Sequence, residues 1–308
     1  MLYNRIMQIV RSMMQYRKSS VVVMVVLCLL SKQWTYAHVA DSNPEPLKLG
    51  NLALPASQQP GPLFGFGQNI IDKHDFLFYN FFDALLGDNK TFIDIAPGLL
   101  YGLRDDLSLY LEVPIAPIFR LGDRRSSGLE DILVQLEYAP YSHNSQKANK
   151  QITTVTSIYL PTGSIRKFPP TGADSPSFFL GLTANYLATD WYCYVSPGGI
   201  ITTEHNNTKA GSQFLYQAGF GRNIAYKTDR WILTWIVEMS GNYTQKRKID
   251  GVVNPHTGGN VILLGPSLWF STPRFLMQAG VAGVPYQNLF GTQFSNKIYW
   301  ALNCAWKF

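Results

Sequence analysis

The chain has 308 residues, enough for one large domain or two small ones. Charged residues make up 15% of it and aromatic residues 14%, while the mean hydropathy is −0.03. The longest apolar run, from Val21 to Leu30, is too short for a membrane-spanning helix, which needs about twenty residues. The composition therefore argues against a helical membrane protein and favours apolar side chains that are spread by alternation.

The first 37 residues have the organisation of a secretory signal peptide. Basic residues precede the apolar run, and the small residues Thr35 and Ala37 follow it. We predict cleavage after Ala37, with Ala40 as the second choice, and hence an exported protein. Removing five bases and no acid lowers the formal net charge from +6 to +1. The high pI of the full chain is therefore no indication of nucleic-acid binding.

Two cysteines, Cys193 and Cys304, remain after the signal peptide. Two cysteines of an exported protein can pair, but these two are expected on distant strands, so we predict two free thiols. The sequence has no CxxC motif and no cluster of His and Cys, and we therefore predict neither a metal site nor another cofactor.

Residues 38–70 are rich in Pro, Gly and Gln and have no sustained hydrophobic period. We expect either a loose extended leader in the periplasm or a plug that folds back into the domain that follows. The sequence leaves both alternatives open.

Residues 71–308 contain about twelve segments in which apolar and polar residues alternate, as in strands with one buried and one exposed face. Polar stretches at 121–128 and 140–150 are expected to be a loop and a long turn. The predicted strands are 75–82, 91–103, 107–119, 131–138, 151–160, 177–187, 191–203, 213–225, 231–242, 260–270, 275–286 and 297–308.

The last strand shows the pattern most clearly. Trp300, Trp306 and Phe308 share its apolar face, and small or polar residues occupy the other face. Aromatic residues on the outward face are expected where a strand meets lipid near the membrane interfaces, although a soluble β-sandwich could end in a similar strand. The even number of strands and the alternation of short turns with long loops favour an all-β fold, a transmembrane antiparallel up-and-down β-barrel in the bacterial outer membrane.

Three stretches, residues 127–141, 157–175 and 178–199, resemble the outer-membrane barrel family named for the MetA pathway of phenol degradation. The family begins a strand with Gly-Leu-Gly-Asp, here Gly128 to Asp131 with Glu130 replacing a glycine, and ends one with Leu-Pro-Thr-Gly, here Leu160 to Gly163. The resemblance implies passage of small, often aromatic, compounds. The final Phe also resembles the end of outer-membrane strands that the barrel-assembly machinery recognises, which implies that machinery as a partner.

Twelve strands enclose a lumen narrower than that of a general porin. Acids outnumber bases among the residues expected to face it, which indicates a mild preference for cations or a site for a polar, uncharged solute. Alternatively, these groups pair with one another and only fill the lumen. The residues expected to line the lumen are Asp94, Tyr110, Glu112, Asp131, Gln135, Glu137, Gln217, Glu238, Gln278, Lys297, Tyr299 and Asn303.

We therefore predict a channel or transporter for small molecules, aromatic or hydrophobic ones among them, that is not an enzyme. Outer-membrane lipid and lipopolysaccharide are expected partners, and nucleic acid is not. A lipid-acting enzyme is the first alternative, because His205 and His256 fall on predicted external loops near Ser212 and Thr257. Neither histidine, however, lies beside an outward-facing serine that could act as a nucleophile.

A structural or adhesive barrel is the second alternative. It would display the external loop 244–257, whose basic cluster Lys246, Arg247 and Lys248 could contact an anionic surface. A solvated loop explains the same composition.

Overall fold

The computed structural model describes residues 48–308, so the predicted signal peptide and the start of the leader lie outside the described residues. Two short 3₁₀ helices, η1 (Gly50–Leu52) and η2 (Ala56–Gln58), precede the strands, and no helix within residues 48–308 is long and apolar enough to cross a membrane. The strands are β1 (Phe76–Gly87), β2 (Lys90–Arg104), β3 (Leu107–Glu112), β4 (Ile115–Leu121), β5 (Arg124–Leu129), β6 (Ile132–Asn144), β7 (Ala148–Leu160), β8 (Ser177–Ala188), β9 (Trp191–Thr202), β10 (Gln213–Lys227), β11 (Trp231–Thr244), β12 (Lys248–Ile249), β13 (Val252–Val253), β14 (Gly259–Ser271), β15 (Phe275–Leu289) and β16 (Asn296–Lys307).

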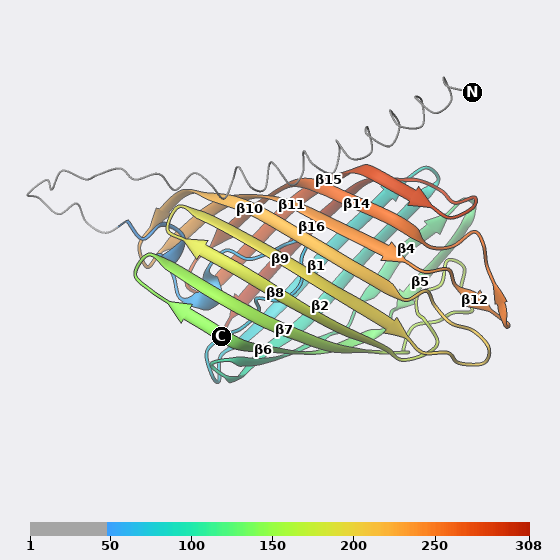
Figure 1. Cartoon of the computed structure of the whole chain (residues 1–308), viewed down its shortest axis with the longest axis horizontal. Coiled ribbons are helices and arrows are strands. Elements are labelled where there is room, and N and C mark those ends of the chain that lie inside the picture. Colours follow the sequence, from blue (N-terminus) through green and yellow to red (C-terminus); the bar gives the residue numbers. More distant parts are fainter. Residues whose placement is uncertain (1–47) are drawn as a thin grey trace, which may run out of the picture. The chain divides into compact units, whose positions relative to one another are not determined.

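The main sheet closes on itself, because β1 pairs antiparallel with β16 on one side and with β2 on the other (Figure 1). β3 and β4 both pair with β2 and are two parts of one interrupted strand, and β5 and β6 pair with β4 and β3 in the same way. The sheet is thus a closed antiparallel barrel of twelve strands, as the alternation predicts. β12 and β13 form a separate hairpin in the loop between β11 and β14.

The alternation places one set of side chains outside and the other inside. On β16, Trp300 and Trp306 are about half exposed, whereas Ala301 and Ala305 between them are buried inside the barrel. Successive residues of a strand point to opposite faces, so one apolar face per strand is enough to make the outer surface of the barrel apolar. The exposed apolar surface meets lipid in a membrane, and the buried clusters lie within the barrel.

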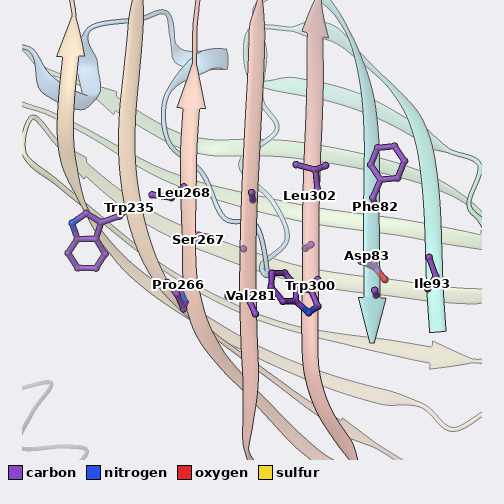
Figure 2. Close-up of a pocket in the computed structure, with 14 residues that line it drawn as sticks. Phe82, Asp83, Ile93, Trp235, Pro266, Ser267, Leu268, Val281, Trp300 and Leu302 are labelled. Atoms are coloured by element: carbon purple, nitrogen blue, oxygen red, sulfur yellow. The ribbon is translucent and has the colours of Figure 1, made fainter. Parts of the chain in front are cut away.

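A shallow apolar groove of about 730 Å³ lies on this outer surface (Figure 2). Trp235 and Trp300 border it, and the small residues Ala279 and Gly280 lie between their strands. Its exposed side chains, such as Trp300, Leu268 and Leu302, are lipid-facing, so the groove belongs to the membrane contact.

Two connections differ from the sequence prediction. The expected loop 121–128 is wrong: β4 and β5 form a hairpin around a turn at Gly122, whose φ of +61° is one that glycine adopts without strain. The expected turn 140–150 is mostly strand, because β6 runs to Asn144 and β7 starts at Ala148. In both cases the polar side chains extend the strands beyond the membrane, where alternation with apolar residues is not required.

The hydrogen-bonded ladder has one gap. β5 pairs only with β4, since β7, the neighbour of β6, ends at Leu160 before it reaches the level of β5. The loop 161–176 lies against the open edge, where Ser126 Oγ donates to the carbonyl oxygen of Pro169 (2.5 Å) and Lys167 Nζ donates to that of Ser127 (2.6 Å). The wall is therefore closed at this place by side chains and a loop instead of a continuous β-ladder.

Candidate functional site: a plugged lumen with two cavities

Residues 48–75, which we call the plug, run inside the barrel before β1 begins (Figure 1). The plug has almost no regular secondary structure, so its backbone N–H and C=O groups need partners from elsewhere. Side chains of the barrel wall supply them. The wall residues that hydrogen-bond to plug backbone groups are Ser108, Glu137, Thr183, Ser196, Gln217, Glu238, Ser271 and Gln278.

Glu238 on β11 is the most heavily bonded of these side chains. It is fully buried, and its Oε2 accepts the backbone N–H groups of Leu63 (2.9 Å) and Phe64 (3.0 Å) and the hydroxyl of Tyr194 (2.7 Å). Its Oε1 accepts the hydroxyl of Ser267 (2.5 Å). Four donors converge on one carboxylate, and an ionised carboxylate offers acceptor atoms and no donor. Two of the donors belong to the plug, so Glu238 attaches the middle of the plug to the wall.

Glu137 on β6 makes a second attachment point. Its two oxygens accept the backbone N–H (2.9 Å) and the side-chain amide (2.7 Å) of Asn69, and the amide of Gln135 donates to it as well (2.7 Å). Glu137 is fully buried. Burying a carboxylate costs free energy unless hydrogen bonds compensate, and here the plug supplies two of the three.

Apolar side chains of the plug complete the attachment. Leu63 and Phe64 pack against Ala282 and Ala301 of the wall, and the ring of Phe66 meets that of Phe179 edge to face at 4.7 Å. Together with the hydrogen bonds, these contacts hold the plug against the inner wall of the barrel. Residues 48–70 of the predicted leader belong to this segment, and residues 38–47 lie outside the described part of the chain.

A cavity of about 600 Å³, which we call the acidic cavity, lies between the plug, strands β1 to β4, the segment between β5 and β6, the end of β7 and the loop 161–176. Asp83 of β1 lies directly opposite Asp94 of β2, and both line the cavity together with Glu130. The single base at the cavity is Arg247 of the external loop, and burial lowers the pKa of its guanidinium group. The other lining residues include Leu63, Phe81, Glu112, Phe119, Asp131 and Tyr159.

A second cavity, of about 530 Å³, shares Leu63 and Gly65 of the plug with the first. Amide and hydroxyl side chains of β10 and β11 and leucines of several strands line it, and Lys90 is its single base. Amide and hydroxyl groups exchange hydrogen bonds with neutral polar groups, so this cavity differs from the acidic one in the solutes that suit it. Its polar wall residues include Gln217, Ser240, Asn242, Thr244, Gln293 and Asn296.

The structure divides the predicted lumen residues into three groups. Asp94, Glu112 and Asp131 line the acidic cavity, and Tyr110 donates to Glu112 (2.6 Å). Another group contacts the plug or its anchors and comprises Gln135, Glu137, Gln217, Glu238 and Gln278.

The third group consists of three residues of β16: Lys297, Tyr299 and Asn303. Tyr299 donates to Asp83 (3.3 Å), and Asn303 donates to Gln278 (3.0 Å). Lys297 lies apart from the lumen: the register of β16 against β1 shifts beside it, and it is an exposed rim residue that forms a salt bridge with Asp88.

Sequence reasoning missed Asp83 and Glu130. Asp83 lies in β1, where apolar residues flank both faces, so the alternation gives no direction for a single acid. Glu130 lies in the break between β5 and β6, where the two-residue period is lost. The available signal for Glu130 was its place in the Gly128 to Asp131 stretch, where the resembled family has a glycine.

Within residues 48–308, the hydrogen bonds of His205 and His256 lead to groups other than a serine hydroxyl. The Nδ1 atom of His205 lies 3.4 Å from Asp174, and the Nδ1 atom of His256 accepts the backbone N–H of Thr292 (2.8 Å). Ser212 hydrogen-bonds to Thr202 and contacts neither histidine. Within residues 48–308, no group of three or more His, Cys, Asp or Glu side chains is arranged to hold a metal ion, and Cys193 and Cys304 are unpaired.

These features define a membrane-spanning β-barrel of the bacterial outer-membrane type, whose lumen is plugged from its own N-terminal side. No family model matches the chain, and no curated protein does. Among solved structures it is similar to the COG4313 outer membrane channel from Pseudomonas putida F1, at 12% identity, with a TM-score of 0.66 over 81% of this chain and 99% of that one. The NanC porin (8% identity, TM-score 0.46, 75% of this chain and 100% of that one) and LpxR from Salmonella typhimurium (9%, 0.39, 74% and 99%) are more distant in structure. At these identities the likeness concerns the fold.

Proposed function

We propose that this protein is an outer-membrane channel or transporter for small molecules that have an apolar or aromatic body. The observation that carries the proposal is the pair of cavities beside the plug. Volumes of about 600 and 530 Å³ lie within the range of about 300–1,000 Å³ typical of small-molecule sites. The resemblance to the phenol-degradation family supports this class of solute, and the likeness to an outer membrane channel supports the role of a channel.

The walls of the acidic cavity suit a solute with two kinds of surface. Phe81, Phe119 and Tyr159 offer aromatic surface, and the carboxyl groups on the adjacent strands offer polar contacts. Aromatic side chains bind the flat faces of other rings, and a few placed polar groups fix their orientation. An inorganic ion needs no such aromatic wall, so the lining favours an organic solute.

The test is transport by the purified, refolded mature chain. In a planar bilayer we expect small, discrete conductance steps, and in liposomes we expect uptake of a radiolabelled phenol at a rate above that of empty liposomes. Uptake of a sugar of similar size serves as the matched control. Equal rates for both solutes, or a silent bilayer together with no phenol uptake by folded protein, would contradict the proposal.

The two alternatives lack a comparable observation. A lipid-acting enzyme needs a nucleophile within hydrogen-bonding reach of a base, and the contacts of His205, His256 and Ser212 do not provide one. An adhesive barrel needs an accessible loop surface. Of the basic cluster at residues 246–248, Lys248 is engaged with Glu204 (2.8 Å) and Arg247 is turned toward the acidic cavity.

A further inference from the structure

The tip of the β4–β5 hairpin carries two arginines on its lipid side. Arg120 of β4 lies directly opposite Arg125 of β5, so the two side chains share one face of the ladder. Ile118, two residues before Arg120 on the same face, is 45% exposed toward lipid, whereas Phe119 between them is buried on the lumen side. The arginine pair therefore continues the apolar outer surface toward the external end of the barrel.

Neither arginine has a counter-charge. None of the salt bridges within residues 48–308 involves Arg120 or Arg125, and Nε of Arg120 is shielded from solvent without a hydrogen-bond partner. Like charges directly opposite each other destabilise a sheet, and a shielded N–H group without an acceptor adds a desolvation cost. An anion that accepts from both guanidinium groups would remove both costs.

Further positive charge surrounds the pair. Arg124 lies over the ring of Phe168 (6.0 Å), and Lys167 reaches the backbone of the same hairpin. Asp123 is the single acid between residues 115 and 129. The hairpin tip and loop 161–176 thus form a basic patch at the rim, contributed by two segments that are distant in sequence.

We propose that Arg120 and Arg125 bind the phosphate groups of a phosphorylated glycolipid, the lipopolysaccharide of the outer leaflet. The fork of a guanidinium group matches two phosphate oxygens, and arginine is the favoured side chain for this contact. The place also fits, because lipid phosphates lie just beyond the hydrocarbon layer, where the exposed isoleucines of β4 end and the arginines begin. The bound lipid would cover the barrel beside β5, the strand with no second neighbour in the ladder.

The test compares lipid A that carries two phosphates with the same lipid after enzymatic dephosphorylation, each in detergent micelles with the refolded protein. The R120Q/R125Q variant is expected to bind the bisphosphorylated lipid at least about ten-fold more weakly than wild type, because it loses two charge-assisted contacts. The R230Q/R274Q variant removes the same charge from exposed turns at the opposite rim and is expected to bind as wild type does. Heat-shifted gel mobility reports whether each variant is folded.

Equal binding of the two lipids by wild-type protein would overturn the proposal without any variant, and so would an equal loss of binding in both double variants. Inorganic phosphate is added as a competitor: displacement at millimolar concentration would show a general anion site and contradict the assignment to lipid. If R120Q/R125Q does not fold, R125Q alone, whose side chain is exposed, tests the same contact. Lipid binding is measured without any transport, so failure of this proposal and failure of the proposed function can be told from each other.

Discussion

The attachment of the plug by Glu238 can be tested quantitatively with the variant E238Q. The glutamine keeps the shape of the side chain, and its amide oxygen can still accept from Leu63, Phe64 and Tyr194. Two of these bonds, those from Leu63 and Phe64, join Glu238 to the plug. Hydrogen bonds to a charged group contribute about 1.5–3 kcal/mol and neutral ones about 0.5–1.5 kcal/mol, so the variant loses about 1 kcal/mol in each of these two bonds. A total of about 2 kcal/mol corresponds to an increase of roughly 30-fold in the population with a detached plug.

Amide hydrogen exchange measures this population directly. We expect the peptide that contains Leu63 and Phe64 to exchange up to about 30-fold faster in E238Q, while peptides of β7 and β8 keep their wild-type protection. The matched control is E204Q, which neutralises an exposed acid in the loop between β9 and β10, where Glu204 pairs with Lys248. Exchange of the plug peptide within about three-fold of wild type, in a folded E238Q barrel, would refute the role given to this carboxylate.

Three further outcomes are expected. Substitution E112Q should lower the ratio of cation to anion permeability, measured as a smaller reversal potential in a salt gradient, because Glu112 lines the acidic cavity. E137Q should change this ratio less, since the Glu137 carboxylate is buried against the plug. A larger change in E137Q than in E112Q would contradict the assignment. Deletion of residues 56–69 should raise the single-channel conductance several-fold, and an unchanged conductance would show that the plug does not limit the passage. Brominated lipid should quench the fluorescence of a variant whose single tryptophan is Trp300, which is 51% exposed. A variant whose single tryptophan is Trp269, which is 5% exposed, should be nearly unquenched. Equal quenching of the two variants would contradict the assigned faces.

The sequence is sufficient to predict the barrel, because the physical requirement that creates the fold is local. Each strand needs one apolar face for lipid, so every second residue of the strand is apolar. Residues Trp300, Leu302, Cys304 and Trp306 of β16 show this pattern. The signal fails where the strand leaves the membrane. At β5 the residues Arg124 to Gly128 still pair as a strand, but outside lipid the outward face no longer has to be apolar.

The plug could not be predicted in the same way. Its conformation depends on wall side chains from strands all around the barrel, and nothing in a stretch rich in Pro, Gly and Gln specifies those partners locally. The sequence of the wall contains an indirect sign of the plug, because carboxylates such as Glu137 and Glu238 occupy inward positions of the strands. From the sequence they could equally be explained by a water-filled pore, and only the position of the plug decides between the two explanations.

This distinction changes how the charge of the lumen is interpreted. A count of inward acids treats Glu137, Glu238 and Glu112 alike, yet the first two have their oxygens occupied by donors from the plug and the wall. The acids that line a cavity are those of the acidic cavity, Asp83, Asp94, Glu112, Glu130 and Asp131, which lie together on one side of the lumen. Selectivity in this barrel should therefore depend on that side alone, and neutralising an acid elsewhere should act through the plug. The contrast between E112Q and E238Q separates the two effects, because one variant is expected to alter permeability ratios and the other the protection of the plug amides.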